Sequence, residues 1–117
     1  MLPNKIQIKI FTQNTVDLKA IIPIFHSWIQ DNLLDGLPLD VADYRHVPNG
    51  PGILLMGHEG EYALDLAQGR PGITYAHKRD WPEMANTLEA RIDWVLARVQ
   101  KAAALLEIAT SLQFDQC

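Results

Sequence analysis

The chain of 117 residues and 13.2 kDa falls within the size range of one domain, which excludes a multidomain architecture. Hydrophobic residues make up 48% and charged residues 21% of the sequence, close to the globular average, so the composition excludes disorder and fibrous repeats. Ten basic and fourteen acidic residues give a formal net charge of −4, which provides no source for the counterion release that drives nucleic-acid binding. We therefore expect a single domain over residues 1–117 with no nucleic-acid partner.

The sequence also predicts where the protein is located. Its single cysteine, Cys117, has no partner for an intramolecular disulfide, so the fold does not depend on an oxidising compartment. Residues 1–10 alternate polar and apolar side chains, whereas a signal peptide contains a continuous apolar stretch. No window approaches the roughly 20 apolar residues of a membrane-spanning helix. We expect a cytoplasmic protein that is neither secreted nor inserted into a membrane.

The N-terminal part of the chain predicts a strand followed by a helix. Residues 5–12 alternate apolar and polar side chains, the pattern of a half-buried strand. Over residues 18–29 the apolar side chains recur at spacings of three and four, which predicts an amphipathic helix with Thr15 or Asp17 as its N-cap. Pro23 falls inside this pattern and lacks a backbone donor, so the helix either bends there or begins there.

The middle of the chain predicts further strands separated by turns. Residues 39–44 have the pattern of a short strand, and the proline- and glycine-rich residues 48–52 predict a turn with Pro-Gly in type II positions. Residues 53–56 and 62–66 are mostly apolar and predict the two strands of a β-hairpin. After another turn, residues 73–77 predict the last strand.

The hairpin brings titratable side chains together in one hypothetical register. If it turns at Glu59 and Gly60, His58 lies opposite Glu61, and one face carries an imidazole and two carboxylates, the second from Asp65. A histidine within reach of a carboxylate is suited to general acid–base work or metal ligation. In the simpler interpretation His58 and Glu59 are solvated residues of the hairpin tip, and Asp65 is a polar residue near a turn.

A metal site is a second hypothesis for the polar residues. Asp43, His46 and His58 compose a two-histidine, one-carboxylate set of the kind that binds iron or another divalent metal, provided that strand pairing brings the two histidines together. The sequence has no His-Glu-x-x-His motif and no cysteine pair. The simpler interpretation is that these are polar residues of an edge strand, and we expect no cofactor.

The C-terminal third predicts one long helix. Residues 80–83 combine an N-cap acid, a proline and a second acid in a capping-box-like start, and no glycine or proline follows. A helix over residues 81–112 would be roughly 48 Å long, whereas a domain of this size has a radius of gyration of about 13 Å. The helix therefore either folds back at the alanine run 102–104 or overhangs and packs against a second copy. We favour a homodimer, with an interface formed by Leu105, Leu106, Ile108 and Leu112.

Three stretches resemble a family of small uncharacterised bacterial proteins. They are DVADYRHVPNGPG at residues 40–52, LMGHEGEYALD at residues 55–65 and FHSWIQ at residues 25–30, and the resemblance covers roughly residues 5–80. It implies a compact bacterial cytoplasmic protein with no established activity. The polar members of the matching stretches form the candidate polar site, which consists of Asp43, His46, His58, Glu59 and Asp65.

Together the elements predict an α+β domain with the order β-α-β-β-β-β-α. In it, an antiparallel sheet of four to five strands is packed by one N-terminal helix and a long C-terminal helix. We expect a non-enzymatic homodimeric binding or assembly module, because the helix is long and apolar and no catalytic set is complete. The alternative is a small metal- or cofactor-dependent enzyme that uses His46 and His58 with nearby carboxylates. A small-molecule ligand is compatible with both functions.

Overall fold

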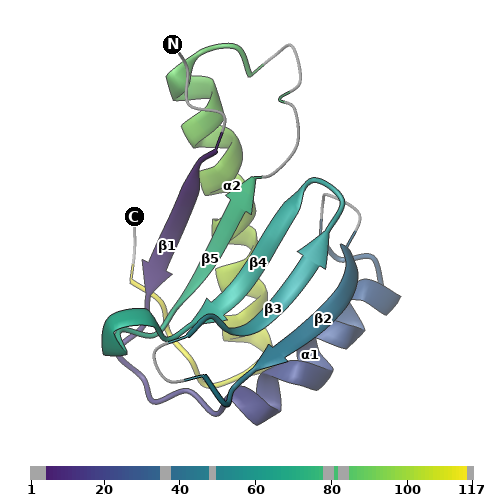
Figure 1. Ribbon diagram of the computed structural model, residues 1–117, viewed down its shortest axis with the longest axis vertical. Helices are drawn as coiled ribbons and strands as arrows, with labels where there is room; N and C mark the ends of the chain where they lie inside the picture. Colours follow the sequence, from purple (N-terminus) through teal and green to yellow (C-terminus); the bar gives the residue numbers. More distant parts are fainter. Residues whose placement is uncertain (1–4, 35–37, 48–49, 78–80, 82–84, 116–117) are drawn as a thin grey trace.

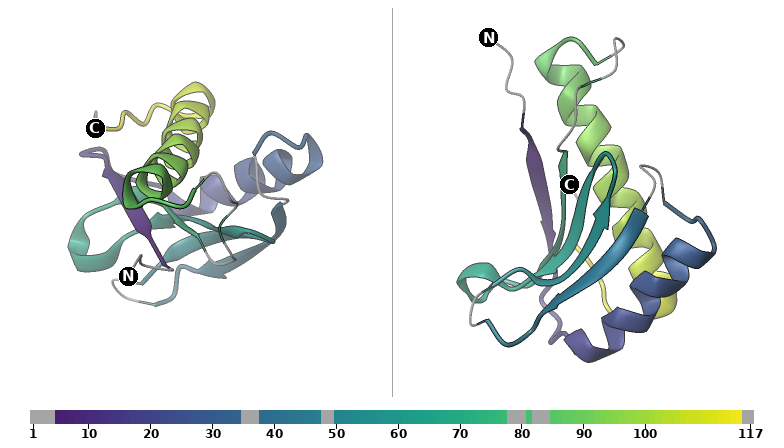
Figure 2. Two further views of the ribbon diagram at one scale, coloured as in Figure 1. Left: turned by 90° about the horizontal axis from the view of Figure 1, so that it is seen from above. Right: turned by 45° about the vertical axis from the view of Figure 1, so that its right-hand side comes forward.

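In the computed structural model the chain forms one five-stranded antiparallel sheet with two helices packed on the same face (Figure 1, Figure 2). The structure describes residues 5–34, 38–47, 50–77, 81 and 85–115. The predicted α+β class and element order are confirmed. The elements are β1 (Gln7–Phe11), α1 (Leu18–Gln30), β2 (Pro38–Tyr44), β3 (Gly52–Gly57), β4 (Gly60–Asp65), the short 3-10 helix η1 (Ala67–Gly69), β5 (Gly72–His77) and α2 (Leu88–Ala109).

The strand order across the sheet is β1-β5-β4-β3-β2, and every neighbouring pair is antiparallel. Strands β2 to β5 form a meander, and β1 adds to the free side of β5, so β1 and β2 are the two edges. Helix α1 packs against β2 and β3, whereas α2 packs against β5 and β1 (Figure 1). The opposite face of the sheet is not covered by either helix, and we call it the uncovered face.

The core lies between the sheet and the two helices. Alternation along each strand sends one set of side chains toward the helices, and these are mostly apolar, as expected for a sheet buried on one face; His77, buried at the end of β5, is an exception. The core cluster includes Ile10, Ile53, Leu55, Tyr62, Leu64, Ile73 and Tyr75 from the strands; Ile21, Phe25 and Trp28 from α1; and Val95, Val99, Ala102, Ala103 and Leu106 from α2.

Helix α1 begins where the sequence pattern predicts. The Asp17 carboxylate accepts a hydrogen bond from the Lys19 backbone N–H at 3.2 Å, which makes Asp17 the N-cap. Pro23 lies inside the helix, so the alternative start at Pro23 is wrong.

Helix α2 begins later than predicted. It starts at Leu88, where the Thr87 hydroxyl accepts a hydrogen bond from the Ala90 N–H at 3.1 Å. Trp81 precedes the helix, and the other residues of the predicted capping box lie outside the described residues. The helix ends because Thr110 adopts an extended backbone and its hydroxyl donates to the Leu106 carbonyl at 2.6 Å.

The length of α2 resolves the choice between a broken and an overhanging helix. Its 22 residues run without interruption through the alanine run, and span about 33 Å. The overhang is at the N-terminal end, where the first turns project past the sheet and leave Leu88 and Ile92 partly exposed (Figure 1). No helix in the described part of the chain combines the length and the apolar composition required to cross a membrane.

The hairpin of β3 and β4 differs from the predicted register by two residues. Met56 pairs with Glu61, so the connection is the two-residue turn His58–Glu59. The faces are as predicted, because a shift of two residues preserves the alternation. Gly60, the first residue of β4, fits closely against β5: a Cβ at this position would lie 2.6 Å from the Tyr75 hydroxyl.

Candidate functional site

The predicted polar site is divided between two ends of the sheet. His46 lies in the turn after β2, whose last residue pairs with Gly52, whereas His58 directly follows Gly57 at the other end of β3. Strand β3 has six residues and spans about 20 Å, so it separates the two histidines. Within the described residues no group of three or more His, Cys, Asp and Glu side chains could hold a metal ion. The two-histidine arrangement is therefore wrong, because consecutive turns of an antiparallel meander lie at opposite ends.

Asp43 forms a local ion pair at an exposed turn. Its carboxylate accepts the Arg45 backbone N–H at 2.9 Å and lies 2.9 Å from Arg45 Nη2. The backbone hydrogen bond, together with the hydrogen bond from the Arg45 side chain and the positive charges of Arg45 and His46, lowers the pKa of Asp43 from its ordinary value. These contacts favour the ionised carboxylate and assign it to stabilising the turn.

The hairpin tip contacts α2 through Glu59. The Glu59 carboxylate lies 4.0 Å from Arg98 Nη2, and the Arg98 guanidinium stacks 3.8 Å from the centre of the Trp94 ring. His58, beside it in the turn, is exposed. The tip residues thus connect the sheet to one flank of α2.

Asp65 belongs to the uncovered face. Its Oδ2 lies 3.3 Å from Lys9 Nζ, and its Oδ1 accepts the Ala67 backbone N–H at 3.1 Å. Glu61 lies on the same face, as the alternation predicts, and His58 lies in the turn at the end of the hairpin. A hollow of about 160 Å³ on this face is lined by Gln7, Pro51, Leu54, Glu61, Ala63, Asp65, Thr74 and Ala76.

The four residues of the predicted dimer interface do not form one surface. Leu106, on the core face of α2, is 0% exposed, and Leu112 is 6% exposed because the chain turns back after α2 and places it in the core. Leu105 is half-buried against the same core, and only Ile108 is exposed, at 82%. The assignment of Leu106 and Leu112 to an interface is therefore corrected: the chain itself covers them.

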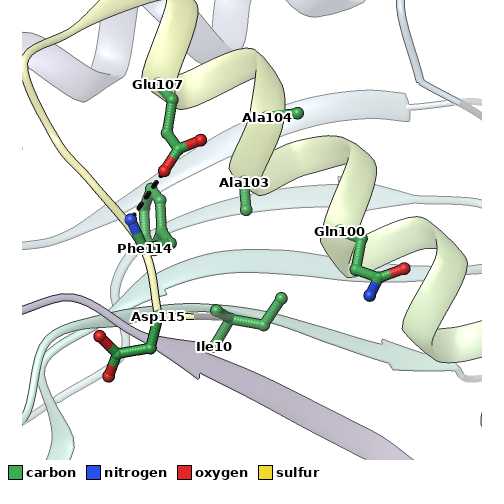
Figure 3. Close-up of a pocket in the computed structure, with 7 residues that line it drawn as sticks. All are labelled: Ile10, Gln100, Ala103, Ala104, Glu107, Phe114 and Asp115. Atoms are coloured by element: carbon green, nitrogen blue, oxygen red, sulfur yellow. Dashed lines mark hydrogen bonds between the residues drawn. The ribbon is translucent and has the colours of Figure 1, made fainter. Parts of the chain in front are cut away.

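A larger groove lies between α2, β1 and the C-terminal segment 110–115, and we call it the β1–α2 groove (Figure 3). Its volume is about 360 Å³. The groove is open because Ala103 and Ala104 project little beyond the helix backbone. Its lining consists of Ile10, Gln100, Ala103, Ala104, Glu107, Phe114 and Asp115.

Strand β1 presents backbone groups along this groove. The Ile6 carbonyl accepts the His77 N–H and the Thr12 N–H donates to the Pro71 carbonyl, so the even-numbered residues of β1 bond to β5. In an antiparallel edge strand the alternate residues direct their N–H and C=O groups away from the sheet. Gln7, Lys9 and Phe11 are these residues. Phe11 has a partner, since its carbonyl accepts the Asp115 N–H at 2.8 Å.

The C-terminal segment is extended and pairs with the end of β1. Thr12 and Phe114 form an antiparallel bridge, and the Thr12 hydroxyl donates to the Gln113 carbonyl at 2.6 Å. The Phe114 N–H donates to Glu107 Oε2 at 2.8 Å, which ties the segment to α2 (Figure 3). One extended segment of this chain thus already lies in the groove, between the edge strand and the helix.

The flank of α2 that faces β1 is acidic. Glu89, Asp93, Gln100 and Glu107 follow at spacings of four, seven and seven, which places them on one side of the helix. Basic residues of α2 fall on the other flank: they are Arg91, Arg98 and Lys101. Asp115 adds a further exposed carboxylate at the end of the groove.

The chain matches no protein-family model, no curated protein and no solved structure. The resemblance to small bacterial proteins therefore stays a prediction. Sequence reasoning missed the β1–α2 groove, because alanine, glutamine and isoleucine carry no chemical signature of a site. The one available signal was the separation of acidic and basic residues on the two flanks of the C-terminal helix.

Proposed function

We propose that the protein is a non-enzymatic binding module that takes part in protein assembly through the β1–α2 groove. The observation that carries the proposal is the position of the groove beside an edge strand whose backbone groups at Gln7 and Lys9 are directed away from β5. Backbone groups of this kind are a ready template for another chain. A cytoplasmic location is part of the proposal, and the single cysteine of the sequence supports it.

The polar residues favour binding over catalysis. Asp43 is held by Arg45, Asp65 by Lys9, and Glu59 lies beside Arg98, so each of these carboxylates has a structural role. The groove itself is lined by four apolar side chains, two of them alanine, together with two carboxylates and one amide. This composition is typical of a surface that recognises a polypeptide rather than of a reaction centre.

Site-specific photocrosslinking in the native cells tests the proposal. A benzoylphenylalanine replaces Gln100, which lines the groove, or Gln30, an exposed glutamine at the end of α1 that serves as the matched control. We expect covalent adducts with a protein from position 100 and none from position 30. An adduct of twice the chain mass identifies a second copy, and any other mass identifies a different protein.

Two results would contradict the proposed function. One is the absence of an adduct at position 100 under conditions in which the photoprobe is incorporated and the protein is folded. The other is the same set of adducts from positions 100 and 30, because that result indicates collisions rather than a specific surface.

A further inference from the structure

We infer that the occupant of the β1–α2 groove is an extended basic peptide segment, which adds to β1 as a sixth strand antiparallel to it. This inference rests on the proposed function and specifies the partner of the same site. The observations that support it are the outward backbone groups of β1, the lining of the β1–α2 groove and the acidic residues on the adjacent flank of α2.

The backbone of β1 selects an extended ligand. The outward N–H and C=O groups of Lys9 exchange two hydrogen bonds with the ligand residue opposite, and those of Gln7 do the same two residues further along. The antiparallel direction follows from the chain itself, because Phe114 pairs with Thr12 in this direction on the same edge. A ligand strand in this direction pairs with Lys9 and Gln7, on the N-terminal side of Phe11, whose carbonyl accepts the Asp115 N–H.

Alternation then decides which ligand side chains contact the groove. Residues opposite Lys9 and Gln7 direct their side chains to the uncovered face, whereas residues opposite Ile8 and Ile10 direct theirs toward α2. The position opposite Ile10 meets Ile10 and Ala103 and has about 360 Å³ beside it. This volume and lining favour a small or medium apolar side chain such as valine.

Charge selects basic residues at the other positions that face α2. Glu89, Asp93 and Glu107 lie on the same side of α2 as the groove-lining Gln100, and Asp115 lies at the end of the groove. Lys9 does not neutralise this flank, because its side chain lies on the uncovered face and pairs with Asp65. A basic ligand is therefore complementary to the rim, and the formal charge of −4 on the chain steers it in the same direction.

The test is an NMR titration of the full ¹⁵N-labelled chain with the peptide acetyl-Val-Thr-Arg-Thr-Arg-amide. In the antiparallel register its valine lies opposite Ile10, its first threonine opposite Lys9 and its first arginine opposite Ile8. We expect saturable shifts of the Gln7 and Lys9 amide signals. We also expect that binding weakens with added salt and weakens strongly when the first threonine is N-methylated, because methylation removes the donor to the Lys9 carbonyl.

Charge variants of the protein distinguish binding at the groove from a nonspecific attraction between the basic peptide and the acidic chain. We expect Glu107→Gln and Asp93→Asn each to lower the affinity for the peptide about three- to tenfold. Glu107→Gln keeps an oxygen acceptor for the Phe114 N–H. The matched control Asp31→Asn, at an exposed position after α1, leaves the affinity unchanged. The peptide in which glutamates replace both arginines should bind at least about tenfold more weakly, because the acidic residues of α2 repel its carboxylates.

Other outcomes overturn the inference. One is that no amide signal shifts saturably at millimolar peptide. Another is that the arginine and glutamate peptides bind equally well. A third is that the shifted signals belong only to residues of the uncovered face. Concentration-dependent protection of the Gln7 and Lys9 amides without peptide would identify a second copy as the occupant. Photoadducts at position 100 together with any of these results would leave the proposed function standing and contradict only the basic peptide.

Discussion

Lys9 crosses β5 on the uncovered face of the sheet and reaches Asp65, with 3.3 Å between Nζ and Oδ2. The side chain passes over Gly72, where a Cβ would lie 2.9 Å from Lys9 Cε. Both side chains are largely covered, with 16% and 14% of their surfaces exposed, although no helix packs on this face. The ion pair therefore joins the edge strand β1 to β4 across the strand between them.

Removing one partner of this pair should destabilise the fold. We expect Asp65→Asn to lower the free energy of unfolding by about 1–2 kcal/mol, because the Lys9 ammonium loses its counter-charge in a largely covered position. The double variant Lys9→Met with Asp65→Leu should recover most of the loss. Urea unfolding monitored by circular dichroism measures both. A double variant less stable than Asp65→Asn would contradict this account.

Leu106 and Ile108 distinguish a core position from a surface position on the same helix. Leu106→Ala should lower the free energy of unfolding by about 2–5 kcal/mol, since the side chain is fully buried in the core. Ile108→Glu should change it by less than about 0.5 kcal/mol, because this side chain is exposed. Chemical denaturation gives both values. If Ile108→Glu changes the molar mass in light scattering, the exposed isoleucine is an interface residue after all.

Gly60 and Gly69 should respond differently to alanine. At Gly60 a Cβ meets the Tyr75 hydroxyl at 2.6 Å and the Ala76 carbonyl, so Gly60→Ala should cost about 2–3 kcal/mol through displaced backbone. At Gly69 a Cβ has open space, and the cost of Gly69→Ala should be about 1 kcal/mol, from its φ of 65° alone. Thermal unfolding compares the two variants. Equal losses would show that steric contact does not set the hairpin register.

Thr12 should control the docking of the C-terminal segment. Thr12→Val removes the hydroxyl that donates to the Gln113 carbonyl and accepts the Asn14 N–H, and should cost about 1–2 kcal/mol. Hydrogen exchange of the Asp115 amide, which donates to Phe11, should accelerate in this variant. The matched control is Thr15→Val, at an exposed position, which should leave the exchange rate unchanged.

The carboxyl group of Asp43 should titrate below its ordinary pKa of 3.8, because it accepts the Arg45 backbone N–H and lies beside the Arg45 guanidinium. A pKa lowered by folding contributes stability that is present above the unfolded value of 3.8 and is lost as the pH falls through the folded value. NMR titration of the carboxyl group measures this pKa. Arg45→Gln should raise it toward 3.8, and an unchanged pKa in that variant would exclude the side chain as a cause.

Local sequence patterns determined the elements of this protein and the side chains that each element buries. The alternation of residues 5–12 specifies β1, and the spacing of three and four specifies α1 even with Pro23 inside it. The Pro51–Gly52 pair predicts a turn; in the structure Gly52 has the predicted positive φ, 68°, but is the first residue of β3. These features depend on periods of two and 3.6 residues and on backbone preferences, which are properties of neighbouring residues along the chain.

Tertiary packing decided how those elements meet, and therefore decided the site. The direction of the meander separates His46 from His58, and the hairpin pairs in a register two residues from the predicted one, with Gly60 fitted against Tyr75. Leu112 is buried because the chain turns back at Thr110 toward β1, and Ile10 lines the groove only because α2 crosses that edge. Contacts between residues so distant along the chain depend on which surfaces fill the core together, and no local period encodes that choice.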